Sequence, residues 1–141
     1  LTEISNGNPK DDLEQIEGIG PKIEELYFNN GIYSFRDLSK LDNSALKHIL
    51  REGGKRFNRH DPETWAKQAE LAAEGKWEEL KNWQKELVIK AFKRDFGLRE
   101  SLKFLDSSNK AFRETVMPTL SERTGLSPKF IEINIEEIKL L

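Results

Sequence analysis

The residues that decide the fold are Glu17-Gly18-Ile19-Gly20-Pro21-Lys22, which lie between Leu13-x-x-Ile16 and Ile23-x-x-Leu26. Two short amphipathic segments therefore flank a turn that contains two glycines. Glycine tolerates a positive φ and lets another backbone approach closely, and proline suits the first position of a helix. The stretch predicts two helices joined by a tight hairpin, with the second helix starting at Pro21.

A turn of this kind leaves the unpaired N–H groups of a helix N-terminus exposed to solvent. Backbone N–H groups at a helix start bind anions, and a nucleic-acid phosphate is the usual one. We therefore predict that the backbone of Gly18, Ile19 and Gly20 holds a phosphate, with the Lys22 side chain beside it. The alternative is a tight turn between two packed helices with no ligand.

Overall charge argues against a strong, non-specific nucleic-acid binder. The chain has 23 Lys and Arg against 25 Asp and Glu, a formal charge of −2, whereas such domains are usually basic. Four carboxylates surround Lys22 in the sequence and would repel a phosphate at short range: Glu14, Glu17, Glu24 and Glu25. This balance favours the alternative function, an adaptor or scaffold whose acidic surface engages a protein partner.

The most basic stretch follows later, at residues 51–60, where Lys55, Arg56 and Arg59 lie close to Gly53 and Gly54. Lys55, Arg56 and Arg59 are predicted to form a second contact for an acidic partner, either nucleic acid or protein. The alternative is a solvated loop with ordinary surface charge.

Turn-forming and helix-capping residues along the chain predict the remaining elements. Residues 1–10 are polar and turn-rich and predict a flexible leader. Helix starts are expected at Asp11 or Asp12, at Ser34, at Asp42 or Asn43, and at Asp61-Pro62, where Asp precedes Pro and a first-turn Glu. Trp65, Trp77 and Trp83 recur at helical spacing beside Leu and Ala, which indicates core positions rather than a base-stacking surface.

The hairpin pattern resembles the helix-hairpin-helix family, in which Gly-apolar-Gly is followed by a helix that starts near a Lys or Arg. The stretch from His60-Asp61-Pro62 through Trp77 to Leu87 is similar to one bacterial module of that family. This module occurs as an extension of a ribosomal protein in Bacteroidetes and is sometimes labelled a flap-endonuclease-like 5′ nuclease. The resemblance covers residues 11–87 and implies an all-α, SAM-like bundle that grips a phosphate without reading sequence.

The nuclease label is not carried over to this chain. Flap nucleases cut with metal-bound carboxylates in a separate domain, and His48 and His60, the chain's two imidazoles, lack metal-ligand spacing. We predict a non-catalytic module with no metal site and no cofactor, which binds nucleic acid weakly and without sequence specificity.

Residues 88–141 lie outside the resemblance and predict a C-terminal helical region. Helical turns are expected up to Leu105 and again from Lys110 to Thr124, with a bend at Pro118. Residues 130–135 alternate with the period of a short strand, yet Ile131, Ile135 and Ile138 also fit a helix. This apolar tail is expected to pack on the helical module, to mediate self-association or to engage a protein partner.

The absence of certain residues and segments from the sequence indicates where the protein is located. It has no cysteine, which fits a reducing compartment, and no apolar run long enough to span a membrane. A cytoplasmic location is therefore expected. Leu1 stands where a start Met would, which is compatible with a fragment of a longer or membrane-anchored protein.

Overall fold

The computed structural model describes residues 2–5, 8–94 and 110–141, and the chain divides into two compact units, Leu1–Leu80 and Lys81–Leu141. The division falls seven residues before the end predicted for the helix-hairpin-helix module. Helix α5 (Trp77–Arg94) begins in unit 1 and continues into unit 2. The described fold is all-α, as predicted, except for one pair of short strands.

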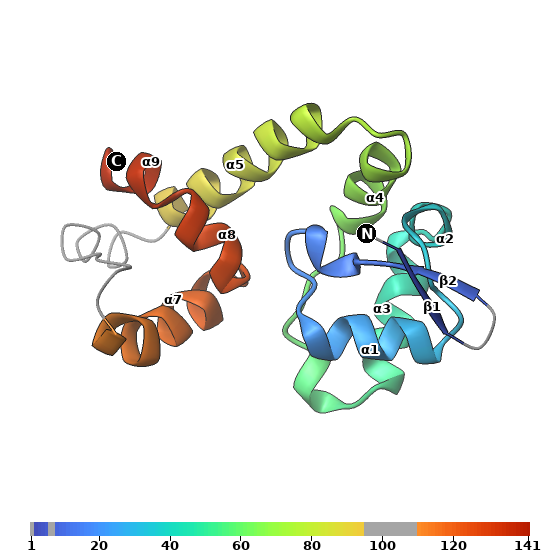
Figure 1. Ribbon diagram of the computed structural model, residues 1–141. Coiled ribbons are helices and arrows are strands. Elements are labelled where there is room, and N and C mark those ends of the chain that lie inside the picture. Colours follow the sequence, from blue (N-terminus) through green and yellow to red (C-terminus); the bar gives the residue numbers. More distant parts are fainter. Residues whose placement is uncertain (1, 6–7, 95–109) are drawn as a thin grey trace. The chain divides into compact units, whose positions relative to one another are not determined.

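Unit 1 consists of short helices around a single core (Figure 1). Its helical elements, in chain order, are η1 (Leu13–Gln15), α1 (Pro21–Asn29), α2 (Phe35–Ser39), α3 (Asn43–Glu52), η2 (Lys55–Phe57) and α4 (Trp65–Ala73). The pair η1–α1 is the helical hairpin that the sequence predicts, and α2–α3 forms a second helical pair whose starts follow the signals at Ser34 and Asp42. The first helix is a single 3-10 turn rather than an α-helix.

The helix starts of this unit follow from local side-chain caps. Asp12 Oδ1 accepts the Glu14 N–H at 3.2 Å, and Asp42 Oδ1 accepts the Ala45 N–H at 2.8 Å. Ser34 and Asp37 form a reciprocal capping box at the start of α2. Each cap satisfies donors that a helix N-terminus otherwise leaves open.

Trp65 and Tyr27 form the centre of the unit 1 core. Their rings meet edge to face, with centroids 6.0 Å apart, and the Tyr27 hydroxyl donates to the Leu46 carbonyl at 3.3 Å. The other tryptophans differ from the prediction, because Trp77 is 45% exposed and rests edge-on against Phe35, and Trp83 is only half-buried. Fully buried aliphatic side chains complete the core, among them Leu13, Ile16, Ile19, Leu38, Leu46, Leu50 and Leu80.

The N-terminal residues have a strand pair where the sequence predicts a flexible leader. Strand β1 (Thr2–Ser5) pairs antiparallel with β2 (Asn8–Asp11), with Thr2 opposite Asp11 and Ser5 opposite Asn8. The end of β2 is joined to the unit, since the Asp11 N–H donates to the Tyr33 carbonyl at 2.8 Å and Asp11 Oδ2 accepts the Phe35 N–H at 2.8 Å. Asp11 therefore acts at the start of α2, and Asp12 caps η1.

Helix α4 begins later than its sequence signal suggests. The sequence predicts a helix that opens at Asp61-Pro62, but α4 starts at Trp65. Asp61 Oδ1 instead accepts the Glu63 N–H at 3.1 Å, and the Trp65 N–H donates to the Pro62 carbonyl at 3.0 Å. The Asp-Pro signal thus forms a turn that leads into the helix, because Asp side chains also stabilise turns two residues on.

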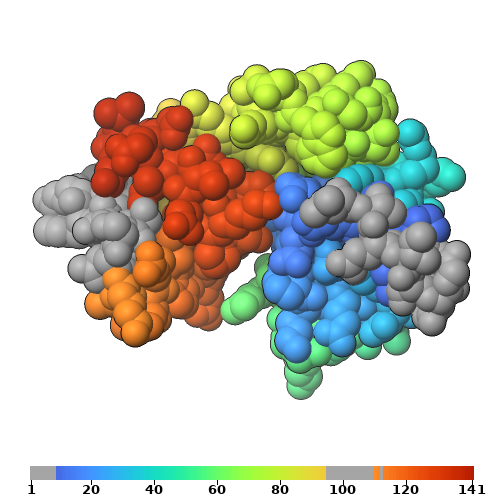
Figure 2. Space-filling view, in the orientation of Figure 1, coloured from blue at the N-terminus to red at the C-terminus, as the bar shows by residue number. Residues whose placement is uncertain are grey.

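Unit 2 packs α7 (Met117–Thr124), α8 (Pro128–Ile133) and α9 (Ile135–Lys139) with α5 around a second core. A π-helical turn, η4 (Phe112–Val116), precedes α7, in a region where the sequence predicts a helix with a bend at Pro118. In Figure 2, α8 lies against α7 (orange), and α9 follows α8. The core residues are Val88, Ala91, Phe92, Met117, Leu120, Leu126, Phe130, Ile131, Ile135 and Ile138.

The short strand expected at residues 130–135 is not present. These residues belong to α8 and α9, and the helical spacing of Ile131, Ile135 and Ile138 buries all three. A lone strand would have needed a partner edge, whereas two short helices bury the same side chains against α5. The turns predicted at residues 96–105 lie outside the described residues.

No helix in the described ranges has the length and apolar character needed to cross a membrane.

Candidate nucleic-acid interface

The hairpin turn has two glycines with different roles. Gly18 has φ +102°, and a Cβ placed on it would lie 2.5 Å from Nε1 of Trp65. Gly20 has φ −97°, an ordinary extended conformation, and apart from its chain neighbours no heavy atom of the described residues lies within 4 Å of a Cβ built on it. Gly18 is therefore needed for packing, whereas the space in front of Gly20 is open to a ligand.

Beyond the turn, no side chain of the described residues caps the N-terminus of α1. Gly20 is the N-cap residue, Pro21 follows it, and the Gly20 carbonyl accepts the Glu24 N–H at 3.0 Å. Within the described residues no hydrogen bond engages the N–H of Gly18 or Gly20. These N–H groups, together with those of Lys22 and Ile23 after Pro21, remain available for an anion.

The backbone N–H of Ile19, in contrast, is already engaged in a hydrogen bond. It donates to the Ile16 carbonyl at 3.1 Å, and the Ile19 side chain is 1% exposed in the core. Of the three backbone positions predicted as donors, the geometry leaves Gly18 and Gly20 with unengaged N–H groups and uses Ile19 to close the turn.

The predicted cations lie on α1 and on the loop that packs beside it. Lys22 is exposed in the first turn of the helix, and Leu26, four residues later, shares its face. A Cβ on Gly53 would lie 2.7 Å from Leu26 Cδ2, so the loop that leads into η2 packs directly beside this face. Lys55 and Arg56, both exposed, belong to η2, and the loop lies next to α1 in Figure 1.

Arg59 is exposed two residues after η2, beside His60. Burial, and secondarily the neighbouring Arg59 charge, lower the pKa of His60 below its usual 6.5. His60 is therefore neutral at pH 7 and adds no charge to the basic loop. The loop's positive charge comes from Lys55, Arg56 and Arg59.

Three carboxylates lie on the other side of the hairpin. Asp12, Glu14 and Glu24 bring oxygens within 4.8 Å of one another, close enough to share a cation. Glu24 Oε2 accepts the Leu13 N–H at 2.9 Å, which joins η1 to α1. Desolvation first, then the charges of Glu14 and Asp12, raise the pKa of Glu24 to about 6. At neutral pH this cluster is anionic and opposes phosphate binding at the adjacent helix start.

Because the pKa of Glu24 is higher in the folded chain than its usual 4.5, the stability of the folded state falls as pH rises from about 4.5 through 6. Glu24→Gln keeps an acceptor for Leu13 and removes the charge. We expect this substitution to raise the free energy of unfolding at pH 7 by about 0.5–1 kcal/mol, a value reduced for solvent screening, and to change little at pH 4.

Urea unfolding at both pH values measures the effect, with the exposed Glu25→Gln on the same helix as the control. An equal gain at pH 4 and pH 7 would contradict the assigned repulsion.

Gln68, which the sequence does not predict as a site residue, is buried beneath the hairpin turn and hydrogen-bonds to it. Gln68 on α4 is 0% exposed, and its Oε1 accepts the Glu17 N–H at 2.7 Å. Its Nε2 donates to the Glu17 carbonyl at 3.1 Å and to Thr64 Oγ1 at 3.0 Å. The only sequence signal was the position of Gln68 among apolar residues on one helix face, three residues after Trp65.

Two helical pairs, the first joined by a Gly-Ile-Gly turn that presents a helix N-terminus, define the class of helix-hairpin-helix proteins. Residues 13–73 match the family model described as the RS2/RL21/YNQ2 HHH domain. This segment is therefore a helix-hairpin-helix domain, as its motif predicted, and the rest of the chain lies outside the match. No curated protein and no solved structure matches the chain.

Proposed function

We propose that the helix-hairpin-helix module binds nucleic acid weakly, without sequence specificity and without catalysis. The observation that carries this proposal is the open N-terminus of α1: free space at Gly20 beside an exposed Lys22. Backbone N–H groups and the positive end of the helix dipole attract phosphate irrespective of base identity. Lys55, Arg56 and Arg59 would contact a neighbouring phosphate of the same strand.

The acidic cluster limits the strength of this binding. Non-specific complexes usually have a Kd of about 10⁻⁴–10⁻⁶ M at physiological salt, and we place this module at the weak end of that range. If all four cations contact duplex phosphates, log K should fall with log salt with a slope of about −3 to −4.

Lys22→Glu tests the assignment of the site. We expect it to weaken binding of a labelled oligonucleotide by about tenfold at low salt, because it reverses the charge beside the phosphate and removes one ion-pair contact. Fluorescence anisotropy with duplex and single-stranded probes measures the change. Lys40→Glu is the matched control, since Lys40 is equally exposed but lies in the α2–α3 connection, which lacks glycines.

Two outcomes count against the proposal. A flat titration of the unmodified chain with both probes removes the function altogether. Equal losses for Lys22→Glu and Lys40→Glu would place binding elsewhere on the surface.

The second candidate is an adaptor in which the hairpin is only structural. The clustered carboxylates of Asp12, Glu14 and Glu24 favour it, because they suit a basic protein surface better than a phosphate. Under this function the oligonucleotide titration is flat, and a protein partner is retained by the Lys22→Glu variant.

A further inference from the structure

The contact between α4 and the hairpin turn has the form of a clasp. Both polar atoms of the Gln68 amide engage the backbone of Glu17, a residue 51 positions earlier in the chain. The two bonds also fix the orientation of the amide, since a flipped amide would face donor against donor and acceptor against acceptor. Thr64, one helical turn before Gln68, accepts a further bond from Nε2.

The clasp determines where the turn lies. Trp65 and Gln68 are three residues apart on α4, so they share a face. The Trp65 indole abuts Gly18 while the Gln68 amide holds the residue just before it. Helix α4 thus fixes the position of Glu17 and Gly18. These residues come directly before Ile19, Gly20 and the uncapped start of α1. A turn fixed in advance loses less conformational freedom when a ligand binds.

From this geometry we infer that Gln68 is a positioning residue for phosphate binding: it holds the turn in the binding conformation without touching the ligand. The inference rests on the function proposed above. Gln68 is completely buried beneath the turn, so any effect on affinity must pass through the Glu17–Gly20 backbone.

Gln68→Glu tests the inference with almost no change in shape. An ionised carboxylate still accepts the Glu17 N–H, but it cannot donate to the Glu17 carbonyl or to Thr64. Protonation restores one donor. We therefore expect affinity for a labelled oligonucleotide to be about five- to tenfold below that of the unmodified chain at pH 8, and within about twofold of it at pH 5.

Each pH is compared with the unmodified chain, because Glu17, the titratable side chain next to the clasp, and the cluster of Asp12, Glu14 and Glu24 are common to both proteins. Gln84→Glu is the matched control: Gln84 is a buried glutamine of α5 in unit 2, 6% exposed. The Gln84→Glu chain acquires a buried carboxylate of the same kind. Its affinity for the oligonucleotide should equal that of the unmodified chain at every pH.

The outcomes separate this inference from the proposed function. If the unmodified chain does not bind, the proposed function fails. If it binds and the folded Gln68→Glu chain binds equally well at pH 8, the positioning role is overturned. Should Gln68→Glu not fold, Thr64→Val removes only the outer bond of the clasp. It should weaken binding two- to threefold, and unchanged affinity would overturn the inference.

Discussion

Gly18→Ala is expected to destabilise unit 1 by about 2–4 kcal/mol. Part of the loss comes from the backbone, because φ +102° is costly for any residue with a Cβ. The rest comes from packing, since the new methyl group would lie 2.5 Å from the Trp65 indole nitrogen and Trp65 is 2% exposed in a full core. Urea unfolding followed by circular dichroism measures the loss.

Gly20→Ala is the control for this prediction. Its φ of −97° suits alanine and its Cβ meets no atom within 4 Å, so we expect a change of less than about 0.5 kcal/mol. Similar losses at the two glycines would contradict the division of roles between them.

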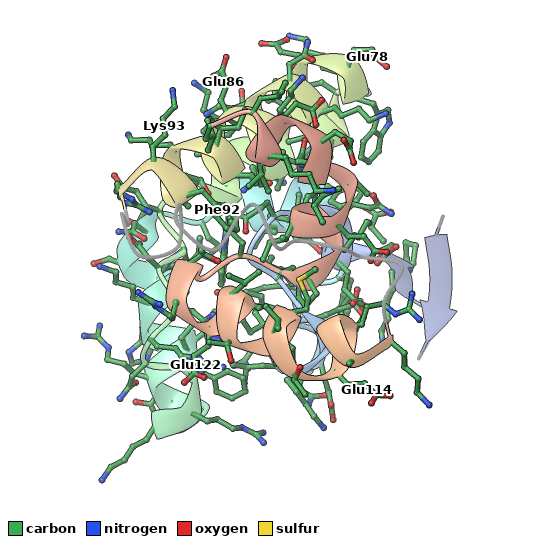
Figure 3. All side chains as sticks on the ribbon, turned by 90° about the vertical axis from the view of Figure 1, so that its left-hand side faces the viewer. Glu78, Glu86, Phe92, Lys93, Glu114 and Glu122 are labelled. Atoms are coloured by element: carbon green, nitrogen blue, oxygen red, sulfur yellow. The ribbon has the colours of Figure 1, made fainter. Side chains whose placement is uncertain are left out.

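Phe92→Ala is expected to destabilise unit 2 by about 3–4 kcal/mol, the usual cost of truncating a buried Phe. Phe92 is 0% exposed and belongs to the second core with Met117 and Ile131. In Figure 3 it is directed inward from α5, whereas Glu86 and Lys93 on the same helix project outward. Thermal unfolding followed by circular dichroism measures the effect.

Ile133→Ala provides the comparison within the same unit, because Ile133 is 58% exposed at the end of α8. We expect a change below about 0.5 kcal/mol. If Ile133→Ala cost as much as Phe92→Ala, the core assigned to unit 2 would be wrong.

Elements with strong local signals could be predicted from sequence. Pro21 at the helix start and Asn29-Asn30-Gly31 at its end bound α1 at Pro21–Asn29, and Ser34 with Asp37 bounds the start of α2. Such caps act over three or four residues, so a single stretch of sequence contains the whole interaction.

Features that depend on distant partners could not be predicted in this way. The strand pair at residues 2–11 is anchored by Tyr33 and Phe35. No pattern within residues 1–10 indicates that these two residues are its partners. The sequence of residues 130–135 fits both the strand period and the helix period. These residues are helical because the helical arrangement buries their apolar side chains against α5.

The candidate site shows the same limit. Its motif was recognisable, and the exposed positions of Lys22, Lys55 and Arg56 suit the role predicted for them. The engagement of the Ile19 N–H and the ordinary φ of Gly20 depend on how the turn closes. The clasp by Gln68 spans 51 residues and became visible only in three dimensions.

The open start of α1 is the proposed phosphate site of this chain. Its most direct test is an amide nitrogen–proton NMR titration of the ¹⁵N-labelled chain with a short oligonucleotide at low salt. Phosphate binding at this site predicts the largest shifts at Gly18, Gly20, Lys22 and Ile23, followed by Lys55 and Arg56. Shifts confined to other parts of the chain, or none at all, would contradict it.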